Sequence, residues 1–167
     1  MLLSFGTEAN TRYYRTSAPI RSIQKNNGDM FNLLLRSGAS MDAGDLQGRI
    51  DYDTLHLPLH YPASIGNGNI LRKLLESGLG VDDKLIEGWT ALFHAAKAGH
   101  DHALRILVFE YHAEFEKTAN GGIYAIHTAA YHNHPKCIDV LLQAGLDINV
   151  ISDAGADGAA FGSEPWQ

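Results

Sequence analysis

The side chains of this 167-residue chain that are best suited to chemistry are its nine histidines. Imidazole binds zinc and exchanges protons near neutral pH, so a histidine cluster could form a metal or acid–base site. His100 and His102 form one close pair, and His132 and His134 form another. If the two pairs lay side by side, four rings could approach one zinc ion. No Cys-x-x-Cys or His-Glu-x-x-His block supports such a site, so we expect no bound metal.

Other signatures of catalysis are absent from the sequence. There is no Gly-x-Ser-x-Gly elbow, no Gly-x-x-x-x-Gly-Lys phosphate loop and no dinucleotide fingerprint after a strand. Gly66-Asn67-Gly68 resembles a phosphate cradle only locally, and a paired-carboxylate site would have to come from the turn-rich segment from Asp42 to Asp53. A mobile loop would not hold carboxylates in the preorganised geometry that catalysis needs. We therefore expect a protein that is not an enzyme and uses no cofactor.

The single cysteine, Cys137, excludes an intramolecular disulfide framework. It falls near an apolar stripe of residues at helical spacing, so two interpretations are open: a packed thiol or a reactive one. The sequence favours the packed thiol, because an isolated cysteine on an apolar stripe behaves as a small hydrophobic residue.

Composition and charge narrow the class of protein further. A formal charge of −6 argues against general nucleic-acid binding, although Arg12, Arg15, Arg21 and Lys25 gather near the N-terminus. That basic group forms either a solvated face or a surface for an acidic partner. The first residues lack the pattern of a signal peptide, and no apolar run reaches membrane-spanning length. We expect an intracellular protein, cytoplasmic or nuclear, without membrane insertion.

An internal repeat must position all of these side chains. Residues 88–100 read GWTALFHAAKAGH, and residues 122–134 read GIYAIHTAAYHNH, 34 positions later. A Leu-Leu-x-x-Gly-like block accompanies each copy and recurs at intervals of 32, 40, 33 and 34 residues. The longest interval contains an insertion between Asp42 and Leu57, which we expect to be a surface loop. A period of this length is typical of stacked structural repeats.

Each unit of the repeat predicts two short helices joined by a turn. Thr90 is a candidate N-cap for the first helix of the best copy, and Gly99 can supply the positive φ that ends it. Asp101 then begins a second helix with an apolar stripe, and Pro135 falls early in the corresponding helix of the next unit. Neither helix is apolar all round, so each must bury its stripe against the neighbouring pair.

The repeated residues resemble the ankyrin-repeat family pattern, Gly-x-Thr-Pro-Leu-His-x-Ala-Ala-x-x-Gly-His followed by a helix ending Leu-Leu-x-x-Gly-Ala. Residues 88–100 and 122–134 match best, Pro58-Leu59-His60 matches in part, and Ala18-Pro19-Ile20-Arg21 is a degenerate copy. The resemblance covers roughly residues 1–155. It implies an all-α fold: an ankyrin-type helical-repeat solenoid with β-hairpin-like finger loops, about four full units and partial units at both ends.

The register of the resemblance divides the chain into six segments. They are a partial repeat at 1–9, a degenerate repeat at 10–42, a repeat at 43–84 with the inserted loop 42–57, repeats at 85–118 and 119–151, and a partial finger with an irregular tail at 152–167. Because both ends fall inside a unit, we expect a monomer or a piece of a longer repeat array. Uncapped ends expose apolar faces, so such a piece would aggregate or unfold easily.

The resemblance also gives structural roles to four histidines. His60 and His127 take the place of the family histidine whose ring bonds to backbone and ties neighbouring fingers together. His100 and His134 fall at the turn between the two helices. The repeat offers no explanation for the remaining histidines, which are His56, His94, His102, His112 and His132.

The family binds proteins through finger tips and the concave face of the first helices, so the resemblance implies a non-catalytic protein-interaction scaffold with a protein partner. An alternative is a regulatory or targeting segment of a larger multidomain enzyme or signalling protein. The residues that we expect at the partner are Tyr14, Arg15, His56, Ile86, Glu87, Trp89, Lys97, Ile123, Tyr131 and His132. For Trp89 there is an alternative: its side chain could pack across the neighbouring finger and fill a gap there.

Two asparagines resemble sites that an iron-dependent asparaginyl hydroxylase modifies in some ankyrin proteins. Asn149 follows Leu141 by eight residues and Asp147 by two, and Asn10 stands in a similar context. The same residues are also ordinary finger consensus, so the alternative is that neither asparagine is modified.

Overall fold

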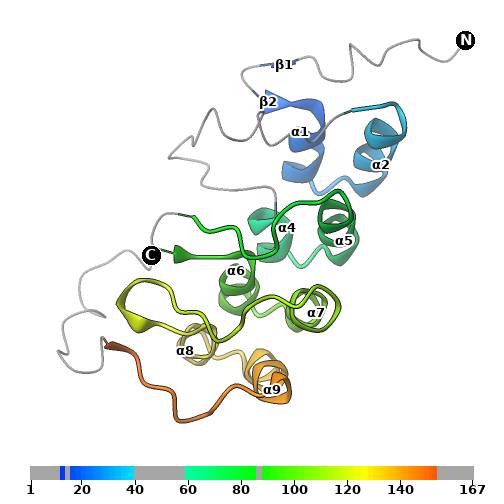
Figure 1. The fold of residues 1–167 in the computed structure, drawn as a ribbon. Coiled ribbons are helices and arrows are strands. Elements are labelled where there is room, and N and C mark those ends of the chain that lie inside the picture. The colour runs from blue at the N-terminus through cyan, green and yellow to red at the C-terminus, as the bar shows by residue number, and fades with distance from the viewer. Residues whose placement is uncertain (1–11, 14–15, 40–58, 86–87, 154–167) are drawn as a thin grey trace, which may run out of the picture.

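The computed structural model describes residues 12–13, 16–39, 59–85 and 88–153, which form a stack of helix pairs joined by finger loops (Figure 1). The inner helices are α1 (Ala18–Gln24), α4 (His60–Ser64), α6 (Ala91–Ala98) and α8 (Ala125–Tyr131). The outer helices are α2 (Gly28–Arg36), α5 (Gly68–Glu76), α7 (Asp101–Arg105) with η2 (Ile106–Glu110), and α9 (Pro135–Ala144). No helix within these ranges is long and apolar enough to cross a membrane.

The fingers are short hairpin-like loops between the helix pairs. In the first, β1 (Arg12–Tyr13) pairs antiparallel with β2 (Thr16–Ser17). In a later finger, Ala119 and Ile123 form an isolated antiparallel bridge around the 3₁₀ turn η3 (Asn120–Gly122). The described fingers therefore confirm the expectation of β-hairpin-like loops on a helical stack.

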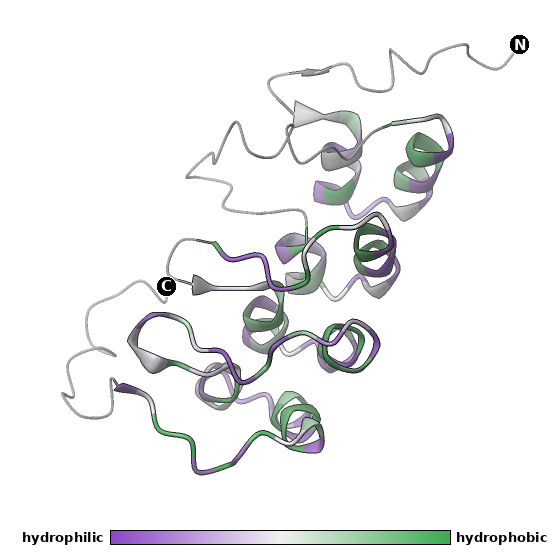
Figure 2. Cartoon of the chain, in the orientation of Figure 1, coloured by the Kyte–Doolittle hydropathy of each residue, from purple (hydrophilic) through white to green (hydrophobic). Residues whose placement is uncertain are grey.

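The core lies between the two columns of helices. Along the inner column α1 contacts α4, α4 contacts α6, and α6 contacts α8, while the outer helices contact one another in the same order. Ala63, Ala95 and Ala129 are fully buried on the inner helices, where small side chains allow close approach. Leu74 and Leu107 fill the outer column. Figure 2 shows hydrophobic residues concentrated on the helices and hydrophilic residues at the turns between them.

The helix boundaries follow the predicted signals closely. Gly99 ends α6 with a φ of 76°, Asp101 begins α7, and Pro135 is the first residue of α9. Thr90 precedes α6 in an extended conformation, but its side chain makes no capping hydrogen bond. Asparagine side chains cap two outer helices, where Asn27 and Asn67 accept hydrogen bonds from the backbone of α2 and α5.

The first unit is one residue out of the expected register. His60 lies six residues before Gly66, the positive-φ residue that ends its inner helix, and the last described unit has the same spacing. Asn26 is the positive-φ residue of the first unit, with a φ of 51°. Counting back six residues from Asn26 places the histidine position of that unit at Ile20 and not at Arg21. Neither residue is a histidine, so the sequence alone could not fix the alignment.

The outer helix of the third pair contains one extra residue. Gly78, which has positive φ, follows the N-cap Asn67 by eleven residues, and the first and last pairs have the same spacing. In the third pair the positive-φ residue is His112, twelve residues after the N-cap His100. The π-helical turn Ile106–Glu110 accommodates the added residue, since a π turn holds one residue more than an α turn.

Candidate interaction surface

Two histidines connect an inner helix to the finger that follows it. The Nε2 of His60, which is fully buried, donates to the carbonyl oxygen of Trp89 at 3.2 Å, and the Nε2 of His127 donates to that of Val150 at 2.9 Å. The Nδ1 of His127 accepts from the backbone N–H of Tyr124, so the proton of a neutral ring lies on Nε2. These contacts confirm the tying role that the family resemblance implied.

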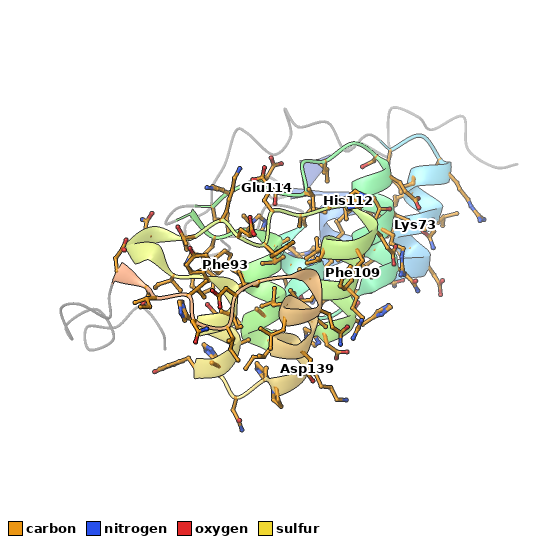
Figure 3. All side chains as sticks on the ribbon, turned by 60° about the horizontal axis from the view of Figure 1, so that its bottom comes forward. Lys73, Phe93, Phe109, His112, Glu114 and Asp139 are labelled. Atoms are coloured by element: carbon orange, nitrogen blue, oxygen red, sulfur yellow. The ribbon has the colours of Figure 1, made fainter. Side chains whose placement is uncertain are left out.

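The inner helix α6 has a phenylalanine at the position of these histidines. Phe93 takes the histidine position in α6 and is labelled in Figure 3. Its buried ring lies 5.7 Å from that of Trp89. The carbonyl oxygen of Ile123 in the next finger accepts from the backbone N–H of Ala119, just as that of Trp89 accepts from the backbone N–H of Leu85. A phenyl ring has no N–H to donate, so the hydrogen bonds of His60 and His127 have no counterpart from Phe93.

A second set of histidine contacts joins successive units at the turns. The Nε2 of His100 donates to the carbonyl oxygen of Ser64, and that of His134 to the carbonyl oxygen of Lys97, each at 3.0 Å. The rings of His132 and His134 stack with centroids 6.4 Å apart. Among the described residues, no group of three or more His, Cys, Asp or Glu side chains is arranged to hold a metal ion.

Glycine is required beside each of these turn histidines for two reasons. Gly66 and Gly99 both have positive φ, which side-chain-bearing residues rarely adopt. A Cβ on Gly66 would also lie 2.6 Å from the Nδ1 of His100, and one on Gly99 would lie 2.5 Å from the Nδ1 of His134. The glycine-histidine pairs therefore allow consecutive units to approach closely.

An aromatic and basic cluster lies where the third finger meets α6. The ring of Trp89 lies 5.5 Å from that of His94, and the Nζ of Lys97 lies 5.6 Å from the Trp89 ring centroid, a cation–π geometry. Trp89, His94 and Lys97 are all half-buried. Trp89 thus packs against α6 of its own unit and stays partly exposed, and its contact with a partner remains a prediction.

The fourth unit places its predicted contact residues beside this cluster in the stack. Tyr131 is 60% exposed at the end of α8, and its ring lies 5.1 Å from that of His132. Ile123 is half-buried against the core. Lys97 and Tyr131 each follow a pair of alanines, so they occupy equivalent positions on helices that contact each other. The other predicted contact residues lie outside the described residues: Tyr14, Arg15, His56, Ile86 and Glu87.

His94 was left unexplained by the sequence but belongs to this surface. Its ring meets that of His60 edge-on at a centroid distance of 5.2 Å, so it bridges two inner helices. Tyr61 holds the equivalent position in α4, and its hydroxyl donates to the carbonyl oxygen of Gln24 on α1 at 2.9 Å. The signal in the sequence was a large polar ring directly after the histidine position in two units.

Asn149, one of the two predicted hydroxylation sites, is exposed in the finger segment after α9. Its backbone N–H and its side-chain amide both donate to the Oδ1 of Asp147, at 2.9 and 3.1 Å. Asn10 lies outside the described residues. Hydroxylation of either asparagine stays a prediction.

The outer helices are joined by an ion pair beside the π turn. The Nε and Nη2 of Arg72 donate to the two carboxylate oxygens of Glu110 at 2.8 and 2.7 Å. These hydrogen bonds raise the pKa of Arg72 and lower that of Glu110. The hydroxyl of Tyr111 donates to the carbonyl oxygen of Arg72 at 3.4 Å. The extra residue of the third outer helix thus lies beside polar contacts to α5.

Cys137 is fully buried in α9, and burial raises the pKa of its thiol to about 11. Since the thiolate is the reactive form, we expect Ellman's reagent at mildly alkaline pH to leave Cys137 of the folded protein unlabelled. The same thiol should react fully once guanidinium chloride unfolds the chain. Absorbance of the released thiolate measures both rates, and equal rates in the two states would contradict the prediction.

Residues 59–152 match the family model of ankyrin repeats in three copies. The chain belongs to the ankyrin-repeat family. The match covers more than half of the chain and contains the histidine ties and the Trp89 cluster. Ankyrin repeats are non-catalytic modules that bind protein partners.

Ankyrin-repeat relatives are longer proteins of several kinds. The probable E3 ubiquitin-protein ligase XBOS32 of Oryza sativa subsp. japonica is 38% identical over 87 residues, which are 51% of this chain and 17% of that protein. The inactive serine/threonine-protein kinase TEX14 of Mus musculus is 32% identical over 116 residues, 70% of this chain and 8% of its own. The probable 26S proteasome regulatory subunit p28 of Saccharomyces cerevisiae is 34% identical over 100 residues, with shares of 58% and 40%. The chain therefore matches less than half the length of each relative.

Proposed function

We propose that the chain is a non-catalytic interaction scaffold that binds its protein partner through the finger tips and the concave face of the inner helices. The observation that supports this surface is the pairing of a half-buried Trp89, covered by Lys97, with the strongly exposed Tyr131 on the next unit. Tryptophan and tyrosine dominate binding hot spots, because a rigid aromatic ring buries much area at small entropic cost. Both residues stand on or beside helices fixed by the stack.

A photocrosslinking experiment tests this surface. We would place benzoylphenylalanine at Tyr131 on the inner helix α8 and, as a matched control, at Asp139 on the outer helix α9 of the same unit, which is labelled in Figure 3. Illumination in an extract of the source cells, followed by mass spectrometry, should give a protein adduct at Tyr131 only. The same adduct at both positions would not support an inner-helix binding face.

Alanine substitutions then measure what the two aromatic residues contribute to the captured complex. Trp89→Ala and Tyr131→Ala should each weaken binding by about tenfold or more, the range of hot-spot residues. Isothermal titration calorimetry gives the affinities, and circular dichroism melting shows whether each variant keeps its fold. If both folded variants bind as tightly as the wild-type chain, the assignment of the concave face is wrong.

The alternative, a regulatory or targeting segment of a larger enzyme or signalling protein, is supported by the relatives. Two of them are named as a ligase and an inactive kinase, and the matched segment is a small part of each. Sequencing the transcript that encodes the chain tests this alternative. A catalytic domain in the same reading frame would favour it, whereas a frame containing only repeats would favour the scaffold.

A further inference from the structure

The inner helices carry charge of one sign. Helices α1, α4, α6 and α8 contain no Asp or Glu, although the chain as a whole has a formal charge of −6. Arg21 lies on α1, Lys97 lies on α6, and Lys25 directly follows α1. The carboxylates of the described helices all lie on the outer column: Asp29, Glu76, Asp101, Glu110 and Asp139.

Two acidic residues of the loops that follow the outer helices make polar contacts. The Oδ1 of Asp82 accepts a hydrogen bond from the backbone N–H of Glu114 at 3.0 Å. The carboxylate of Glu114 forms an ion pair with Lys117. The inner helices thus carry only positively charged side chains on a negatively charged protein, and this asymmetry favours a partner segment of negative charge.

Lys97 is the best-placed cation on this face. Its Nζ lies over the Trp89 ring at 5.6 Å, and both side chains are half-buried. A carboxylate that approached Lys97 would meet a partly desolvated ammonium with an aromatic wall beside it, where an ion pair is stronger than in open solvent. The hydroxyl of Tyr131, in the equivalent position on α8, could donate to the same carboxylate or to a neighbouring one.

The repeat spacing sets the distance between carboxylates in such a partner. Arg21 and Lys25 belong to the first unit and Lys97 to the third, two steps along the inner column. Packed helices lie about 8–10 Å apart, so the two basic groups are roughly 20 Å from each other. An extended peptide rises about 3.3 Å per residue and covers that distance in about six residues.

We propose that the partner segment bound on this face is an extended acidic peptide, with one carboxylate at Lys97 and another about six residues away at Arg21 and Lys25. This inference rests on the proposed function and assigns the chemistry of the bound segment. The exposed Arg21 and Lys25 attract the acidic peptide and set its direction along the stack. Lys97 with Trp89 anchors it.

Fluorescence anisotropy with two synthetic peptides tests the proposal. Both peptides have the same spacing of residues around one tyrosine, with two glutamates six positions apart in the first and two lysines in the second. The glutamate peptide should bind, and Lys97→Glu should weaken it by about tenfold. Lys73→Glu on the outer helix α5, labelled in Figure 3, is the matched control and should leave binding unchanged. Lys97→Met keeps the apolar stem and should weaken binding less than the charge reversal.

Several outcomes would overturn the acidic-peptide proposal. The first is that the glutamate peptide does not bind at millimolar concentration. The second is that the lysine peptide, or a single-stranded RNA of the same length, binds as tightly as the glutamate peptide. The third is that Lys97→Glu and Lys73→Glu lose the same affinity for the glutamate peptide. If the crosslink at Tyr131 still captures a protein, any of these results rejects the acidic segment alone. Failure of the crosslink as well rejects the concave face as the binding surface.

Discussion

Replacement of Gly99 by alanine should lower the free energy of unfolding by about 3 kcal/mol. The residue has a φ of 76°, and left-handed backbone costs an alanine about 1–2 kcal/mol. The new Cβ would also lie 2.5 Å from the Nδ1 of His134 and displace the ring from the carbonyl oxygen of Lys97. Urea unfolding followed by circular dichroism measures the change as a lower midpoint at constant slope.

Gly78→Ala is the matched control for this substitution. Gly78 has an even larger φ of 92°, but an added Cβ would meet nothing within 4 Å. Only the backbone penalty remains, so we expect a loss of about 1–2 kcal/mol. Equal losses in the two variants would show that contact between glycine and the histidine of the next unit contributes nothing to stability.

Replacement of His60 by alanine should also cost about 3 kcal/mol. The side chain is fully buried between α4 and the next finger, so its removal leaves a cavity and ends the hydrogen bond to the carbonyl oxygen of Trp89. The carbonyl keeps its bond from the backbone N–H of Leu85, which limits the loss. Thermal and urea unfolding of the variant and the wild-type chain measure the difference.

His60→Phe separates packing from hydrogen bonding at the same position. Phe93 already fills the equivalent place in α6, so the repeat accepts a phenyl ring there. The variant keeps the buried volume and loses one hydrogen bond, for an expected cost of about 1 kcal/mol. A loss as large as that of His60→Ala would mean that the hydrogen bond, and not the filled volume, dominates the junction.

The sequence predicted those features that are caused by nearby residues and signalled by the repeat pattern. Gly99 ends a helix because glycine accepts positive φ, and Pro135 begins one because the first turn needs no N–H. The histidine ties of His60 and His127 follow from the family pattern, whose histidine stands at the same place in two of the three matched units. The same register brings Trp89, Lys97 and Tyr131 onto the inner side of adjacent units.

The features that sequence could not predict depend on neighbours from other units. The first unit was placed one residue late, because it has neither the histidine nor the glycine that marks the register of the second unit, where His60 and Gly66 are both present. The π turn in the third outer helix has no local signature; its Glu110 pairs with Arg72 of α5, a residue 38 positions earlier in the chain. His94 joined the candidate surface only when α4 and α6 were seen to place it against His60.

The extra residue of the third outer helix shows where this stack can change in length. His134 reaches the carbonyl oxygen of Lys97 at 3.0 Å, the same distance at which His100 reaches that of Ser64, although the added residue lies between the two contacts. The insertion therefore leaves the spacing of the inner column unaltered. The outer helices can therefore absorb an added residue without moving the inner helices, so the proposed binding face tolerates this change in chain length.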